Sequence, residues 1–236
     1  MSKIKVAING AGRIGRAFLK VARERKEIEV VAINDLGSIE SIAYLLKYDT
    51  VYGNSDFTVE VSQDKKSLLI DGKSVAFVSE KEPAKLPWGA LGIDVVVEST
   101  GFYTSYEKSK AHLDAGAKRV VISAPVKDEP TAGIRGATVL LGINDEKLET
   151  CDISSNASCT TNAGSPVMAI LNETIGIEKA ILNILNINEQ TPLEITTDGK
   201  NIIISPVQEK QREKAFKSAL AKVNQRHGKT LKKLAE

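Results

Sequence analysis

The sequence predicts an α/β fold built on a doubly wound, mostly parallel sheet. Short apolar runs typical of buried strands alternate with segments whose apolar residues recur at helical spacing. A glycine-rich turn at residues 10–15 (GAGRIG) separates the first apolar run from the first helical segment. Strands and helices that alternate in this way form parallel sheets covered by helices.

The first part of the chain supplies most of the sheet. Strands are expected over residues 5–9, 28–34, 57–61, 67–78, 93–98, 119–123 and 138–141. Helices are expected over residues 13 to about 24, 39–46, about 106–115 and 160–174. Because Asp71-Gly72 is a hairpin turn sequence, the strands over 57–61 and 67–78 are expected to be short and antiparallel.

After Ser155 the pattern changes to a shortened second region. Residues 180–187 form an apolar, strand-like run, and residues 193–197 and 201–205 flank Asp198-Gly199, which predicts a β-hairpin. From about Gln208 the chain is charged and carries one apolar helical stripe. We therefore expect a β-hairpin followed by a C-terminal helix.

The composition is that of an ordinary globular protein. Of 236 residues, 42% are hydrophobic and 26% are charged, and no apolar run approaches a membrane span. The N-terminus carries no signal-peptide pattern, so we expect a cytoplasmic protein without membrane contact. The two cysteines and two histidines lack metal-ligand spacing, so we expect neither a disulfide framework nor a metal site.

The net charge of +2 is distributed unevenly. Residues 208–236 carry nine Lys or Arg against three Asp or Glu, so the remainder of the chain is mildly acidic. A solvated helix face is the simpler interpretation of this basic tail. The alternative is weak nucleic-acid binding through phosphates, without base readout, because Phe216 is the only aromatic residue there.

The glycine-rich turn indicates a ligand as well as a fold. Gly10 permits a tight turn, Gly12 lets backbone N–H groups approach a pyrophosphate, and Gly15 allows the helix to pack closely on the strand. Asp35 follows the second strand, where its carboxylate can accept hydrogen bonds from ribose hydroxyls and would repel a 2′-phosphate. This context predicts a Rossmann domain that binds NAD. A flavin or nucleotide-sugar site, or a turn without a ligand, is the alternative.

Five motifs extend this prediction along the chain. They are residues 7–16 (AINGAGRIGR), 47–50 (KYDT) with Gly53, 98–102 (ESTGF), 123–125 (SAP) and 155–162 (SNASCTTN). Together they resemble the glyceraldehyde-3-phosphate dehydrogenase family over about residues 1–180. The resemblance implies that NAD is lined by Arg13, Ile14, Asp35, Lys81, Thr100, Gly101 and Ser123. It also implies that Ser158, Cys159 and Thr160 meet glyceraldehyde 3-phosphate and the attacking phosphate.

Cys159 suits this chemistry on its own terms. It lies at the predicted N-terminus of a helix, where the dipole and free N–H groups favour a thiolate. A thiolate can attack an aldehyde to give a thiohemiacetal, which loses hydride to NAD and leaves a thioester that phosphate cleaves. Cys151, in contrast, is expected to be a small buried apolar residue.

The chain departs from the family beyond about residue 180. The resemblance implies a catalytic histidine near position 186, where this sequence has Asn186. His112 lies in a predicted helix of the nucleotide domain and is expected to be a surface or packing residue, while His227 lies in the basic tail. A positioned general acid–base contributes roughly 10²–10⁴ in rate. We therefore expect a chain that binds NAD but oxidises aldehydes poorly.

Residues 182–207 resemble instead the C-terminal part of an AbrB/MazE-like antitoxin domain, with an ordinary hairpin and amphipathic helix as an equal alternative. This supports a second hypothesis, an NAD-binding module fused to an antitoxin-like tail for dimerisation or DNA binding. Unpaired strand edges would then favour a homo-oligomer. The predicted regions are an NAD-binding domain over 1–155, the start of a catalytic domain over 156–180, and a divergent hairpin with a basic helical tail over 181–236.

Overall fold

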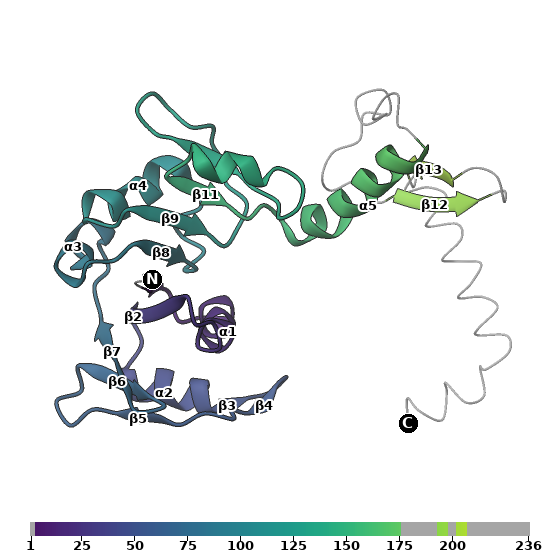
Figure 1. The fold of residues 1–236 in the computed structure, drawn as a ribbon. Coiled ribbons are helices and arrows are strands. Elements are labelled where there is room, and N and C mark those ends of the chain that lie inside the picture. The colour runs from purple at the N-terminus through teal and green to yellow at the C-terminus, as the bar shows by residue number, and fades with distance from the viewer. Residues whose placement is uncertain (1–2, 176–192, 198–201, 207–236) are drawn as a thin grey trace, which may run out of the picture. The chain divides into compact units, whose positions relative to one another are not determined.

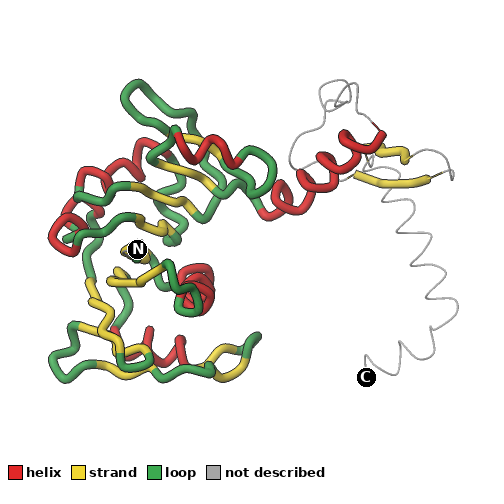
Figure 2. The backbone as a smooth tube through the Cα atoms, in the orientation of Figure 1, coloured by secondary structure: helices red, strands yellow, loops and turns green. Residues whose placement is uncertain are grey.

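The fold is known from a computed structural model that describes residues 3–175, 193–197 and 202–206. The chain divides into two units, residues 1–174 and 175–236. Figures 1 and 2 show how strands and helices alternate along the first unit.

The first unit contains one large sheet, helices that pack against it, and most of a last helix, Cys159–Ile175, whose final residue begins the second unit. The strands of this sheet are β1 (Ile4–Asn9), β2 (Ile28–Asn34), β5 (Val59–Val61), β6 (Ser67–Ile70), β7 (Lys73–Val78), β8 (Val95–Glu98), β9 (Arg119–Ile122), β10 (Gly136–Thr138) and β11 (Ile153–Ser155). The helices are α1 (Arg13–Ala22), α2 (Ile39–Lys47), α3 (Trp88–Leu91), α4 (Tyr106–Asp114) and α5 (Cys159–Ile175), with 3₁₀ turns η1 (Pro83–Lys85) and η2 (Asp145–Glu149). A separate antiparallel pair is formed by β3 (Tyr48–Asp49) and β4 (Gly53–Asn54).

The nine strands follow the order β10-β11-β9-β8-β1-β2-β7-β6-β5. All neighbouring pairs are parallel except β5 with β6 and β6 with β7. The central strand β1 pairs with β2 on one side and with β8 on the other. The strand order therefore reverses between β1 and β8, which is the place where doubly wound sheets bind ligands.

Both faces of the sheet are buried, as the doubly wound prediction requires. Successive side chains of a strand point to opposite faces. Ala7 of β1 and Ala32 of β2 contribute to a core that contains Trp88. Their neighbours Ile8 and Ile33 contribute to the other core, with residues of α1 and α2. The α/β Rossmann-type architecture predicted from the sequence is thus confirmed.

The local predictions are confirmed in most places. Strands β5, β6 and β7 lie within the predicted ranges 57–61 and 67–78, where β5 pairs antiparallel with β6 and β6 with β7, and Asp71 and Gly72 make the turn with φ of 48° and 74°. The strand expected over 138–141 is wrong after Thr138, because Leu140 donates its N–H to Asn144 Oδ1 and the chain turns there. Strand β11 was not predicted, because three residues are too few to display a period.

The described part of the second unit is one hairpin. Its strands are β12 (Leu193–Thr197) and β13 (Ile202–Pro206), which pair antiparallel from Leu193 with Pro206 to Thr197 with Ile202. This confirms the predicted hairpin around residues 198 and 199. The strand expected over 180–187 and the helix expected from about residue 208 lie outside the described residues. No helix in the described part of the chain is long and apolar enough to cross a membrane.

Candidate functional site

The residues predicted to bind NAD and substrate lie after the carboxyl ends of neighbouring parallel strands. Asp35 follows β2, Gly10 follows β1, Thr100 lies just beyond β8, and Ser123 follows β9. Cys159 begins α5, shortly after β11. Since the carboxyl ends of parallel strands share one edge of a sheet, the fold brings these loops to the same edge.

The glycines of the first loop have separable roles. Gly10 has φ of 95°, and a Cβ atom placed on it would lie 2.8 Å from the backbone nitrogen of Thr100. A Cβ atom on Gly15 would lie 2.1 Å from the carbonyl oxygen of Gly10. A Cβ atom on Gly12, the N-cap of α1, would meet no atom within 4 Å. Gly10 and Gly15 are therefore required by the fold, whereas Gly12 leaves open space before a helix N-terminus, which fits a pyrophosphate.

Asp35, which is predicted to bind the ribose, also holds the glycine-rich loop in place. Its Oδ2 accepts a hydrogen bond from the backbone N–H of Ala11, and its Oδ1 accepts one from that of Gly37, both at 2.8 Å. A carboxylate has about four lone-pair sites, so each oxygen can accept a further donor. On the first turn of α1, Arg13 and Ile14 are exposed. These residues fit an adenosine ribose and its surroundings.

The loop after β8 forms the opposite wall. Gly101 has φ of 78°, and Thr100 directs its polar atoms into the protein, since its N–H and hydroxyl both donate to Glu98 Oε1 at 2.8 and 2.5 Å. The exposed Lys81 is tied to this wall through its carbonyl oxygen, which accepts from the Tyr103 hydroxyl at 3.0 Å. Burial raises the pKa of Tyr103, and the charge of Glu98 raises it further.

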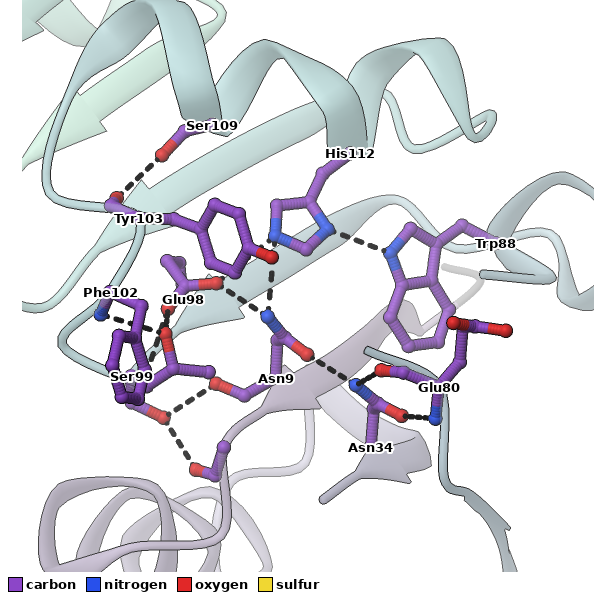
Figure 3. A network of polar contacts seen from close by, with 12 residues as sticks. Asn9, Asn34, Glu80, Trp88, Glu98, Ser99, Phe102, Tyr103, Ser109 and His112 are labelled. Atoms are coloured by element: carbon purple, nitrogen blue, oxygen red, sulfur yellow. Dashed lines mark hydrogen bonds and ion pairs between the residues drawn. The ribbon is translucent and has the colours of Figure 1, made fainter. Parts of the chain in front are cut away.

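A buried row of polar side chains lies beneath these loops (Figure 3). Asn34, Asn9 and Glu98 are register partners across β2, β1 and β8. Asn34 donates to Asn9 Oδ1 at 2.7 Å, and Asn9 donates to Glu98 Oε2 at 2.6 Å. Sequence reasoning missed this row. The available signal was a polar residue at the last position of each buried strand.

His112 is a packing residue and not a surface residue. Its side chain is fully buried, its Nε2 lies 3.0 Å from Glu98 Oε2, and Trp88 Nε1 donates to its Nδ1 at 3.1 Å. An indole nitrogen can only donate, so Nδ1 accepts and the single ring proton lies on Nε2, which donates to Glu98. The neutral imidazole thus connects a tryptophan to a carboxylate.

The loop before α5 presents Cys159. Ser158 Oγ accepts the backbone N–H of Thr161 at 3.0 Å, which caps the helix, and lies 2.9 Å from Thr160 Oγ1. The Asn162 side chain donates to the carbonyl oxygens of Asn156 and Ser158 and closes the turn. Cys159 is exposed at the first position of the helix. The three residues predicted to meet substrate are therefore neighbours on one accessible turn.

The second cysteine has a different environment. Cys151 is buried, as expected from the sequence, and burial raises the pKa of its thiol. Among the described residues, no group of three or more His, Cys, Asp or Glu side chains is placed to hold a metal ion. A cavity of about 660 Å³ lies beside β10 and is lined by none of the predicted site residues.

Comparison with known proteins agrees with this geometry. Residues 4–106 match the family model described as the NAD binding domain of glyceraldehyde 3-phosphate dehydrogenase. A relative from Kluyveromyces marxianus, named glyceraldehyde-3-phosphate dehydrogenase 1, is 45% identical over 197 residues, which are 83% of this chain and 56% of the relative.

Bacterial relatives have similar sequence identity and coverage. A protein of the same name from Bacillus subtilis is 42% identical over 196 residues, 81% of this chain and 56% of the relative. The glyceraldehyde-3-phosphate dehydrogenase of Streptomyces coelicolor is 40% identical over 215 residues, 90% of this chain and 59% of the relative. The chain thus spans between half and two thirds of the length of the curated relatives that it matches. These relatives favour the dehydrogenase hypothesis over the fused antitoxin-like module.

Proposed function

We propose that this chain, which belongs to the glyceraldehyde-3-phosphate dehydrogenase family, binds NAD and uses Cys159 to oxidise an aldehyde. Glyceraldehyde 3-phosphate and inorganic phosphate are its proposed substrates. The observation that carries the proposal is the shared edge of the sheet. The glycine loop, the wall at Thr100 and the helix that begins with Cys159 all follow carboxyl ends of one parallel sheet.

The residues proposed to hold NAD are those of three loops. Gly12 provides the open approach to the N-terminus of α1, and Asp35 offers carboxylate oxygens to the ribose. The complete proposed set is Gly10, Gly12, Arg13, Ile14, Gly15, Asp35, Lys81, Thr100, Gly101 and Ser123. When bound, NAD accepts the hydride that the substrate loses.

Cys159 carries the covalent chemistry in this proposal. Its thiolate attacks the aldehyde carbon, and the carbonyl oxygen becomes the oxygen of a thiohemiacetal. Loss of hydride and of the hydroxyl proton converts this adduct into a thioester. Phosphate then attacks the thioester carbon, the C–S bond breaks, and the thiolate is regenerated as acyl phosphate leaves. Ser158 and Thr160 flank the nucleophile with hydroxyl groups that can bind phosphate oxygens.

The rate of this chemistry is proposed to be low. The family resemblance implies a histidine near position 186, and the sequence has Asn186 there. An amide cannot take the proton from a thiol or a hydroxyl at neutral pH, so the loss is roughly 10²–10⁴ in rate. A cytoplasmic location, a homo-oligomer and weak nucleic-acid binding by residues 208–236 also stay predictions.

Phosphate-dependent NADH formation from glyceraldehyde 3-phosphate tests the proposal. We expect slow, phosphate-dependent NADH formation by the unaltered chain and none by the Cys159→Ser variant, with NAD affinity equal in the two proteins. Asn186→His is the matched gain-of-function variant. Turnover by the unaltered chain at about 10–10³ s⁻¹ would refute the low-rate proposal. NAD binding without any dependence of the reaction on Cys159 would refute its catalytic role.

A further inference from the structure

A buried hydrogen-bond relay runs from the core to the wall of the cofactor site (Figure 3). It begins at Trp88, which opens α3, passes through His112 of α4 and ends at Glu98, the last residue of β8. All three residues are at most 2% exposed. The proposed reaction uses none of them.

The relay has a fixed direction. Trp88 can only donate, so His112 accepts at Nδ1 and must donate from Nε2. Asn9 Nδ2 lies 3.5 Å from His112 Nε2, as expected for two donors that share the acceptor Glu98 Oε2. Any change of ring tautomer would bring two N–H groups together at Trp88.

Glu98 is held by four donors, which divide between its two oxygens. Asn9 and His112 donate to Oε2, while the N–H and hydroxyl of Thr100 donate to Oε1. A buried carboxylate is tolerated only when it is hydrogen-bonded in this way. The carboxylate orientation that His112 sets therefore also sets the position of Thr100.

Thr100 in turn fixes the exposed part of the wall. Its hydroxyl oxygen accepts the backbone N–H of Phe102 at 3.1 Å, which shapes the turn through Gly101. Its own nitrogen lies 2.8 Å from the point that a Cβ atom on Gly10 would occupy, so the turn contacts the glycine loop directly. Displacement of Glu98 would thus change both walls of the proposed NAD site.

We propose that Glu98 and His112 are positioning residues, which set NAD affinity by holding the turn at residues 99–102 against the glycine loop. This inference rests on the proposed function only in taking that turn as part of the NAD site. A second branch acts beside the same turn, where Asn34 donates to the carbonyl of Glu80 and accepts its N–H, next to Lys81, whose carbonyl oxygen accepts from the Tyr103 hydroxyl.

Two substitutions at His112 separate positioning from simple core stability. His112→Gln retains one acceptor for Trp88 and one donor for Glu98, because an amide carries both groups. His112→Leu removes both while filling the space. Ile93→Ala is the matched control, since Ile93 is buried in the same core as Trp88 but has no polar side-chain atom.

The experiment measures NAD affinity, thermal stability and amide hydrogen exchange at residues 99–102. For His112→Leu we expect NAD to bind at least about tenfold more weakly and amide exchange in the turn to accelerate by a similar factor. For His112→Gln both values should stay within about threefold of the unaltered chain. Ile93→Ala should lower the melting temperature and leave NAD affinity and exchange in the turn unchanged.

The result that overturns the proposal is unchanged exchange and unchanged NAD affinity in folded His112→Leu. Glu98→Gln is the second variant if His112→Leu does not fold, because it keeps the shape but its NH₂ group meets a donor in either orientation, those of Asn9 and His112 or the backbone N–H of Thr100. Unchanged exchange in Glu98→Gln would overturn the proposal equally. Should the unaltered chain fail to bind NAD, the proposed function fails, while the exchange measurement still decides whether the relay positions the turn.

Discussion

An added methyl group should lower the thermal stability of the chain at Gly15 and its NAD affinity at Gly12. In Gly15→Ala the new Cβ atom would lie 2.1 Å from the carbonyl oxygen of Gly10, which is backbone and cannot move cheaply. Overpacking of this kind costs about 1–3 kcal/mol. For a domain of this size, each kcal/mol lowers the melting temperature by about 2–4 °C. Gly15→Ala should therefore melt roughly 2–12 °C lower.

Gly12→Ala should fold normally and bind the cofactor more weakly. The new Cβ atom meets no protein atom within 4 Å, and Gly12 has φ of −68°, which any residue adopts. Alanine is a weaker N-cap than glycine, which lowers the free energy of unfolding, but it also reduces the entropy of the unfolded chain, which raises it. Each effect is at most about 1 kcal/mol. The methyl group occupies the space proposed for the pyrophosphate, so NAD should bind about tenfold more weakly, or about 1.4 kcal/mol.

The assay combines calorimetric melting with NAD titration of the same samples. The pair of results is what tests the reasoning, because a general loss of folded protein would reduce both readouts together. If Gly12→Ala binds NAD as tightly as the unaltered chain, the pyrophosphate does not approach the N-terminus of α1. If Gly15→Ala melts at the unaltered temperature, the close contact of α1 with the glycine loop is not a feature of the folded protein.

Three further predictions concern the reactivity or protonation of individual side chains: the two cysteines, Tyr106 and His112. Alkylation of the folded chain near neutral pH should modify exposed Cys159 at least about tenfold faster than Cys151, whose pKa is raised by burial. Mass spectrometry of the peptides checks this, and equal rates would contradict it. Burial also raises the pKa of Tyr106. Its contribution to the free energy of unfolding should be present below about pH 10 and be lost as the pH rises through the raised value. Denaturant unfolding of the unaltered chain and of Tyr106→Phe across this pH range measures the difference between their free energies of unfolding. A difference that does not change with pH would contradict the prediction. Finally, nitrogen NMR should find His112 neutral with its proton on Nε2, and a doubly protonated ring at neutral pH would contradict the relay.

Sequence reasoning found the features that have a period or a fixed spacing. The strand before Gly10, the helix after it and the acid at Asp35 are local patterns, and each is where it was expected. Short elements without a period were missed, including α3 and β11. The sequence predicts which loops carry the site, because loops that follow parallel strands meet at one edge of the sheet however the side chains pack. The interactions of Glu98 with His112 were not predictable, because they join residues that only the tertiary fold brings together.

The missed residues nevertheless follow a rule that the sheet itself explains. Strands β1, β2, β8 and β11 end in buried polar residues: Asn9, Asn34, Glu98 and Ser155. An apolar residue at these positions would leave the polar groups that they bond without a partner. An unpaired buried polar group costs about 1–3 kcal/mol, so each of these side chains is stable only while the loop that it holds stays in place. Ser155, for example, donates to the carbonyl oxygen of Ala124, which lies in the loop after β9. The loops that carry the proposed site are therefore held by the last residues of their own strand, as Glu98 holds Thr100, or of a neighbouring strand, as Ser155 holds Ala124.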